Sequence, residues 1–116
     1  SLESALDDEM NLFLADVSEE RVRGYIIGSC DGFSGYIERI AVRNEFRRLG
    51  IGTLLLSAFC DALPETAESI SLEVRASNAP AIGLYGSFGF ERAGVRRGMY
   101  SAPKEDGIVM IKALKG

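Results

Sequence analysis

The groups that could carry acid–base chemistry in this sequence are few, because it contains no histidine. This absence excludes a Ser-His or Cys-His nucleophile pair and a histidine general base, and it leaves carboxylates, tyrosines and lysines. Glu73 lies between Leu72 and Val74 in an alternating segment, on the more polar of its two faces. We expect Glu73 to be the general base; a solvated surface carboxylate is the alternative interpretation.

A glycine-rich turn, RRLGIGT (47–53), precedes the strongest helical pattern of the chain. Its glycines allow a tight turn in which several N–H groups point outward at a helix N-terminus, a geometry that binds anions. The turn lacks the lysine of a GxxxxGK[ST] loop and does not fit GxGxxG, so nucleoside triphosphates and dinucleotides are poor candidates. Gly50 and Gly52 could equally be ordinary helix-entry glycines.

Asn78 and Tyr85 are seven residues apart in a second predicted helix. Seven steps of about 100° bring both residues to one helix face, about 10 Å apart along the axis. One ligand could therefore contact both side chains. The alternative is that Tyr85 is an amphipathic core residue packed under a sheet.

Composition and length predict one domain covering residues 1–116, with 47% apolar residues available for a core. The formal charge of −4 does not favour nucleic acid as a partner. Cys30 and Cys60 have no CxxC spacing, which indicates neither a disulfide framework nor a zinc site. No apolar run approaches the length of a membrane span and no leader opens the chain, so we expect a cytoplasmic protein without membrane contact.

The elements that must position these residues alternate between strand and helix patterns, which predicts an α/β (α+β) domain with a mixed sheet. The second helix is framed by Asn78 as N-cap, Pro80 in the first turn and Gly89 beyond its end. The first helix has an apolar stripe at positions 51, 54, 55, 58, 59, 62 and 63. The expected elements are a short helix at 2–10, strands at 11–17, 21–30 and 33–42, a helix at 51–63, a strand at 68–76, a helix at 79–88, and strands at 89–97 and 107–114 around a loop at 98–106.

Three segments together resemble the GCN5-related N-acetyltransferases (GNAT). Residues 47–52, RRLGIG, fit that family's [QR]-x-x-G-x-[GA] acetyl-CoA loop and follow an IAV strand end at 40–42. Residues 72–90, LEVRASNAPAIGLYGSFGF, and the tail 95–114 are similar to the family's branch of ribosomal-protein alanine acetyltransferases, the RimI-like proteins. The resemblance covers essentially the whole chain, although a strand and a helix of the family pattern would precede the point where this chain starts.

The resemblance implies the GNAT fold, in which a mixed, mostly antiparallel sheet is flanked by helices. It implies acetyl-CoA as the donor and no metal. The pyrophosphate would be bound by the glycine-rich loop and the pantetheine arm by the preceding strand end and by the start of the second helix. The implied donor-binding residues are Ile40, Ala41, Val42, Arg47, Arg48, Leu49, Gly50, Ile51, Gly52, Thr53 and Asn78.

The resemblance also implies direct attack by an amine, with Glu73 as the base and Tyr85 as the acid that protonates the CoA thiolate. Some relatives place a carboxylate at the position of Glu38, which makes Glu38 the rival base. The implied acceptor is a protein N-terminus, the alanine amine of a small-subunit ribosomal protein, with Glu38, Tyr100 and Glu105 on the acceptor side.

Two alternatives stay open at this point: an acetyltransferase acting on lysine or on small amines with the same fold, and a non-catalytic module that binds acyl-CoA. The cofactor motif does not involve the acceptor, so it does not choose between acceptors. A monomer or a weak dimer is compatible with the sequence.

Overall fold

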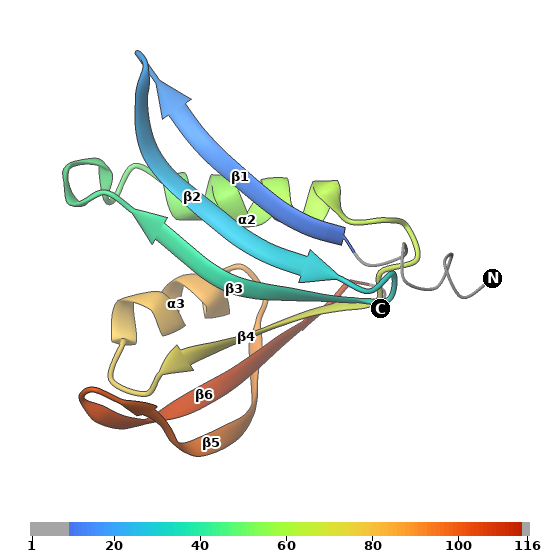
Figure 1. The fold of residues 1–116 in the computed structure, drawn as a ribbon, viewed down its shortest axis with the longest axis vertical. Coiled ribbons are helices and arrows are strands. Elements are labelled where there is room, and N and C mark those ends of the chain that lie inside the picture. Colours follow the sequence, from blue (N-terminus) through green and yellow to red (C-terminus); the bar gives the residue numbers. More distant parts are fainter. Residues whose placement is uncertain (1–9, 115–116) are drawn as a thin grey trace.

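The computed structural model describes residues 10–114, which form a single six-stranded sheet and two α-helices (Figure 1). A short 3₁₀ helix, η1, precedes the first α-helix. The elements are β1 (Met10–Ser18), β2 (Arg21–Cys30), β3 (Ser34–Val42), η1 (Asn44–Phe46), α2 (Ile51–Ala62), β4 (Ser69–Arg75), α3 (Ala79–Ser87), β5 (Glu91–Ser101) and β6 (Lys104–Ala113).

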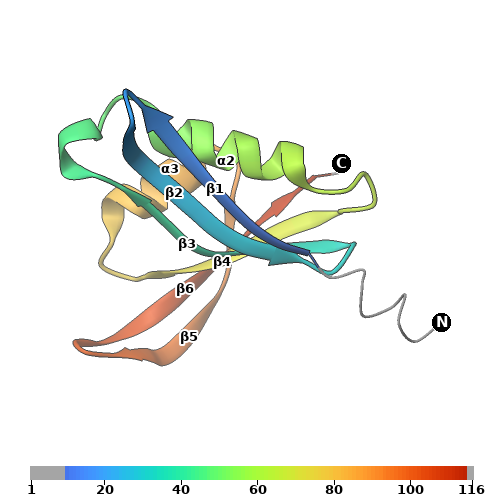
Figure 2. The ribbon, with the colours of Figure 1, turned by 45° about the horizontal axis from the view of Figure 1, so that its top comes forward.

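The strand order is β1-β2-β3-β4-β6-β5, and every neighbouring pair is antiparallel except β3 and β4, which are parallel. The mixed, mostly antiparallel sheet expected from the resemblance is therefore confirmed. Figure 2 shows the strong twist of the sheet, with β1 and β5 at its two edges.

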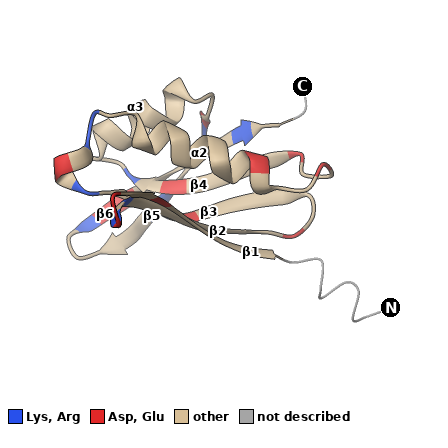
Figure 3. Ribbon diagram, turned by 90° about the horizontal axis from the view of Figure 1, so that it is seen from above, with Lys and Arg blue, Asp and Glu red and all other residues tan. Residues whose placement is uncertain are grey.

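Helices α2 and α3 lie on the same face of the sheet (Figure 3), and the core lies between them and the strands. Phe59 of α2 and Ile70 of β4 are fully buried there. The helix prediction for α2 is confirmed, but its predicted stripe is displaced. Leu54 is 56% exposed, whereas Leu56, outside the predicted stripe, is buried.

The caps of α3 form as the sequence predicts. The Asn78 side chain accepts a hydrogen bond from the N–H of Ala81, and a proline stands in the first turn. At the other end, Gly89 has φ +106°, and the N–H of Phe90 donates to the carbonyl of Tyr85. These two ends fix the position of Tyr85 on the helix.

The C-terminal prediction is wrong between residues 98 and 106. We expected a loop there, but β5 and β6 continue through most of it and turn at Ala102–Pro103. The other strand predictions are confirmed to within one or two residues at their ends. The helix predicted at residues 2–10 lies outside the described residues, except for Met10, where β1 begins.

Strands β3 and β4 pair over only four residues of each, Ser34–Ile37 with Ser69–Leu72. Beyond Ile37 the pairing ends, while β3 continues to pair with β2 as far as Val42. In Figure 1 the two strands diverge toward the end of the sheet where α3 starts. The backbone edge of residues 38–42 that faces β4 is therefore unpaired by any described strand. Glu73 follows directly after Leu72, the last residue of β4 that pairs with β3.

Candidate active site

The start of α2 presents unpaired backbone donors. Gly50 is the N-cap residue and has φ +77°, in the left-handed region that favours glycine. The first helical hydrogen bond runs from the N–H of Leu54 to the Gly50 carbonyl, so the three preceding helical N–H groups have no partner within the helix. These amides lie at the positive end of the helix and form a site for an anion such as a phosphate.

Gly52, in the first turn of α2, allows α3 to pack closely against this helix. A Cβ on Gly52 would lie 2.8 Å from Cδ2 of Leu84 in α3. The missing side chain therefore lets α3 approach α2 closely, and the two helices enclose a cleft between them.

This cleft, which we name the α2 cleft, has a volume of about 660 Å³. It brings together every donor-binding residue expected from the sequence except Leu49, which is 60% exposed and is not among the lining residues. The sequence did not indicate Phe46, Pro80, Ala81 or Leu84, which also line it. The lining residues are Ile40, Ala41, Val42, Phe46, Arg47, Arg48, Gly50, Ile51, Gly52, Thr53, Asn78, Pro80, Ala81, Leu84 and Tyr85.

A second cleft of about 560 Å³ occupies the gap where β3 and β4 diverge, and we name it the β3–β4 cleft. It contains four residues expected to act in catalysis or on the acceptor: Glu38, Glu73, Tyr85 and Tyr100. The lining residues are Ile37, Glu38, Arg39, Ile40, Leu72, Glu73, Val74, Arg75, Asn78, Tyr85 and Tyr100.

The two clefts share three residues, Ile40, Asn78 and Tyr85. A ligand that extends along the α2 cleft would therefore reach the β3–β4 cleft at Tyr85. Tyr85 is 6% exposed, and its ring packs edge-on against Phe90 at 5.8 Å between centroids. Burial, with a smaller contribution from Tyr100, raises the pKa of Tyr85 to about 12, so its phenol keeps its proton at neutral pH.

The Glu73 carboxylate has partners on both oxygens. The Tyr36 hydroxyl donates to Oε1 at 2.6 Å, and Nη1 of Arg96 donates to Oε2 at 2.5 Å. The Tyr36 hydrogen bond, followed by Arg96, lowers the pKa of Glu73 although burial opposes the shift, so Glu73 is ionised at neutral pH. The same hydrogen bond is the largest cause that raises the pKa of Tyr36 to about 12.

The sequence pattern predicts neither of these partners. Tyr36 is 37 residues from Glu73 and Arg96 is 23 residues from it. Their contacts depend on strand order and register, and nothing in the spacing indicates them.

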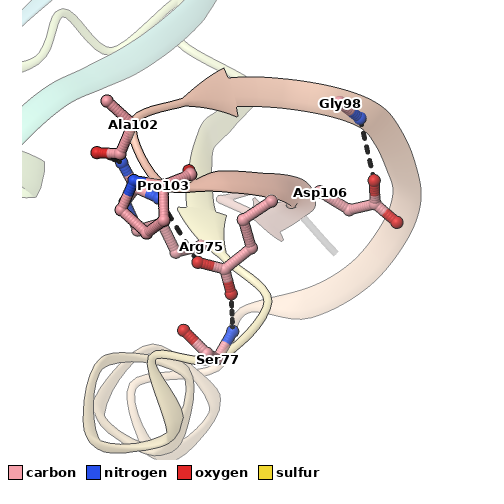
Figure 4. A network of polar contacts seen from close by, with 7 residues as sticks. Arg75, Ser77, Gly98, Ala102, Pro103 and Asp106 are labelled. Atoms are coloured by element: carbon pink, nitrogen blue, oxygen red, sulfur yellow. Dashed lines mark hydrogen bonds and ion pairs between the residues drawn. The ribbon is translucent and has the colours of Figure 1, made fainter.

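The predicted acceptor residue Glu105 lies on β6, outside both clefts. Its carboxylate accepts hydrogen bonds from the backbone N–H of Ser77 at 2.5 Å and from Nη1 of Arg75 at 3.3 Å. Arg75 also donates to the carbonyls of Ala102 and Pro103. Figure 4 shows this network, in which the turn between β5 and β6 is held against the start of α3.

The same network places Tyr100. The Arg75 guanidinium lies over the Tyr100 ring, 4.3 Å from its centroid. On the opposite side of the hairpin, Asp106 accepts a hydrogen bond from the N–H of Gly98 (Figure 4). Glu105 and Asp106 thus fix the hairpin, and the hairpin presents Tyr100 to the β3–β4 cleft.

Within residues 10–114, no group of three or more His, Cys, Asp or Glu side chains is arranged to hold a metal ion. Cys30 is buried, Cys60 is half-buried, and both are free thiols. In the same part of the chain, no helix has the length and apolar character needed to cross a membrane.

Comparison with known families matches residues 2–90 to the acetyltransferase (GNAT) family. The chain belongs to this family, whose donor is acetyl-CoA, and it is an N-acetyltransferase.

The chain is similar to curated proteins that are named as N-acetyltransferases. It is 42% identical to an N-alpha-acetyltransferase of Sulfurisphaera tokodaii, over 91% of this chain and 71% of that protein. It is 39% identical to the [ribosomal protein bS18]-alanine N-acetyltransferase of Salmonella typhimurium, over 88% of this chain and 71% of that one.

A solved structure shares the fold over the whole chain. The crystal structure of the ribosomal-protein-S18-alanine N-acetyltransferase from Escherichia coli superposes with a TM-score of 0.83 at 30% sequence identity, covering 100% of this chain and 78% of that one.

Proposed function

We propose that this N-acetyltransferase acetylates the N-terminal α-amine of a protein, the N-terminal alanine of a small-subunit ribosomal protein, by direct attack of the amine on acetyl-CoA. In this proposal Glu73 is the general base and Tyr85 the general acid. The observation that carries the proposal is the meeting of the two clefts at Tyr85, with the ionised Glu73 on the wall of the second cleft.

The α2 cleft has the features that acetyl-CoA requires. The unpaired amides after Gly50 suit the pyrophosphate, and Arg47 and Arg48 add positive charge beside them. The unpaired edge of residues 40–42 offers backbone groups to the amides of the pantetheine arm. Asn78 and Tyr85, which line both clefts, then lie at the end of the arm that carries the thioester.

The proposed reaction needs one proton acceptor and one proton donor. The amine nitrogen bonds to the thioester carbonyl carbon and loses a proton to Glu73, directly or through a water molecule. The carbon–sulfur bond breaks, and the thiolate takes a proton from the Tyr85 phenol. Transfer of a proton from Glu73 back to the Tyr85 phenolate through solvent restores both groups. The protons and the electron pairs balance without a metal or a redox group.

The state of Glu73 favours an α-amine over a lysine. An α-amine has a pKa of about 7.7–8.0, so a useful fraction is already neutral at pH 7, whereas lysine has a pKa of about 10.4. Glu73, whose pKa lies below the usual value for a glutamate, is too weak a base to deprotonate a lysine ammonium efficiently. Glu73 is basic enough for a neutral amine, because the amine nitrogen becomes strongly acidic once it bonds to the carbonyl carbon and then releases a proton readily.

The acceptor assignment is supported by the β3–β4 cleft and by the relatives. Glu38 and Glu73 give the cleft two carboxylates that attract the positive charge of a peptide N-terminus, and Tyr100 supplies an aromatic wall. The Salmonella typhimurium relative is named for the alanine of bS18 and the Sulfurisphaera tokodaii relative for α-amines. Glu105 is proposed to act on the acceptor side through its hold on the hairpin that carries Tyr100.

The test is a thiol-release assay with acetyl-CoA and three acceptors: an Ala-Arg-Tyr-Phe peptide, a lysine peptide with a blocked N-terminus, and spermidine. We expect fast turnover on the alanine peptide alone, and no turnover on the same peptide once its N-terminus is acetylated. Faster turnover on the lysine peptide or on spermidine would overturn the α-amine assignment. Binding of acetyl-CoA with no turnover on any acceptor would contradict the catalytic roles of Glu73 and Tyr85.

A further inference from the structure

The shortest ion pair made by a residue of the β3–β4 cleft involves Arg96, which has no role in the proposed reaction. Nη1 of Arg96, on β5, lies 2.5 Å from Oε2 of Glu73. The pair is asymmetric, because the Arg96 side chain is 62% exposed whereas that of Glu73 is 10% exposed. A guanidinium so exposed exchanges a carboxylate partner for water at small cost.

The location of Arg96 allows such an exchange. β5 is an edge strand, and its pairing with β6 is irregular between Arg96 and Tyr100. Arg96 is paired through its backbone with Gly107, so the side chain can leave Glu73 without disturbing the strand. By contrast, the second partner, Tyr36, lies in the four-residue overlap of β3 and β4, and its hydroxyl donates to the other oxygen of Glu73.

The ion pair with Arg96 opposes the function of Glu73 as a general base. Arg96 is among the causes that hold the pKa of Glu73 low, so the pair stabilises the carboxylate and opposes its protonation. Once Glu73 takes up a proton, the charge that holds Arg96 is gone. Arg96 therefore has to leave Glu73 at some stage of the reaction, and the arriving acceptor brings a cation of the same charge.

We propose that Arg96 is a positioning residue that occupies Glu73 while no acceptor is bound, and that the α-ammonium of the acceptor displaces it. This inference rests on the proposed function, because it assumes that the acceptor amine comes to Glu73. One cation then replaces another on a nearly buried carboxylate, so Glu73 keeps a partner. The bound ammonium releases one proton to solvent before the neutral amine attacks, and Glu73 takes the second proton during the attack. After the exchange, Tyr36 alone fixes the carboxylate in place.

Other charged and titratable groups also surround Glu73 in the β3–β4 cleft and limit how much Arg96 alone changes its properties. Only Arg96 forms an ion pair with Glu73 among the described residues. The groups around Glu73 are Tyr36, Glu38 and Arg39 on β3, Arg75 on β4, Tyr85 on α3, and Arg96 and Tyr100 on β5.

The test is calorimetric binding of the Ala-Arg-Tyr-Phe peptide in the presence of CoA, which has no acetyl group to transfer. In Arg96→Gln the peptide no longer competes with a guanidinium, and we expect its Kd to fall about two- to fivefold, the range for an ion pair with an exposed partner. Arg97→Gln is the matched control, since it removes the same charge from the next position of β5, and its Kd should equal that of the wild type. Arg96→Lys, which keeps a cation, should lie between.

A second readout separates displacement from a merely structural ion pair. The NMR signal of the Arg96 Nε–H should shift toward the position of a solvated arginine when the peptide is added to the wild-type protein with CoA. An unchanged or weaker peptide affinity in Arg96→Gln, or an Arg96 signal that does not respond to the peptide, would overturn the inference. If the wild type turns over the alanine peptide while either result is found, the proposed function stands and this inference alone fails.

Discussion

Replacing Tyr85 with phenylalanine tests the proposed acid directly, because the change removes one oxygen and keeps the ring. We expect kcat to fall 10²- to 10⁴-fold, the usual contribution of a positioned general acid, which corresponds to roughly 3–5 kcal/mol in the barrier. The loss should be nearly independent of pH between 6 and 9, since the pKa of Tyr85 is about 12 and its phenol stays protonated throughout that range.

The fold should tolerate this substitution. The Tyr85 ring is buried and packs edge-on against Phe90, and phenylalanine keeps that contact. Burial and Tyr100 raise the pKa of Tyr85, and no hydrogen bond contributes to that shift, so loss of the hydroxyl should leave no protein group in the described residues without a partner. We therefore expect the free energy of unfolding to change by less than about 1 kcal/mol.

The assay is thiol release at saturating acetyl-CoA and peptide, together with calorimetric binding of acetyl-CoA and a denaturation curve. Tyr25→Phe is the matched control. Tyr25 stacks on Phe13 and lines neither cleft, so the Tyr25→Phe variant should have the activity of the wild type. A Tyr85→Phe variant with kcat within threefold of the wild type across the pH range would refute the acid assignment.

Three further substitutions test the base, the loop and the core. Glu73→Gln should lower kcat at least about 100-fold and abolish the part of the acid-side decline that follows protonation of Glu73, whose pKa lies below its usual 4.5. The decline set by protonation of the acceptor amine, near its pKa of about 7.7–8.0, should remain, and the pH–rate profile separates the two. Gly50→Ala should cost about 1–2 kcal/mol of stability because φ is +77°, and should weaken acetyl-CoA binding in calorimetry. Gly28→Ala should cost about 1–3 kcal/mol in urea denaturation with unchanged m, since its Cβ would overlap the Tyr36 carbonyl and lie 2.6 Å from Cε2 of Phe59. Full activity in Glu73→Gln, unaltered binding in Gly50→Ala or an unaltered unfolding midpoint in Gly28→Ala would contradict the respective argument.

The strands were predictable where one face is buried. In β4, Ile70, Leu72 and Val74 alternate with more polar residues, and the structure buries them in the same alternation. The caps of α3 were predictable for a local reason as well, since the residues that satisfy the end groups of a helix are its sequence neighbours.

The apolar stripe of α2 shows where periodicity is insufficient. Residues 54–56 are three consecutive leucines, so apolar residues lie on more than one side of the helix. Only packing against the twisted sheet decides which of them is buried, and it buries Leu55 and Leu56 while Leu54 faces solvent. Strand order and twist, which a pattern within one helix does not contain, set that choice.

The hairpin of β5 and β6 was missed for a related reason. Pro103 and the charged run after it have low strand propensity, and propensity alone favours a loop. In the structure, the carboxylates of Glu105 and Asp106 accept backbone N–H groups of Ser77 and Gly98. Tertiary hydrogen bonds thus outweigh the local preference, and they use the same acidic residues that suggested a surface for a basic peptide.

In the candidate site, too, residues that are neighbours in the sequence were predictable, whereas contacts between distant strands were not. The glycine-rich loop is one continuous segment, so its residues were identified together. The surroundings of Glu73 come from β3, β4 and β5. The parallel register of β3 and β4 places Tyr36, and the registers of β4 with β6 and of β6 with β5 place Arg96. A shift of the β3–β4 register by one residue would turn Tyr36 to the other face of the sheet and leave Glu73 with Arg96 alone. The chemistry of Glu73 therefore depends on a four-residue overlap of two strands, whose end also opens the cleft for the acceptor.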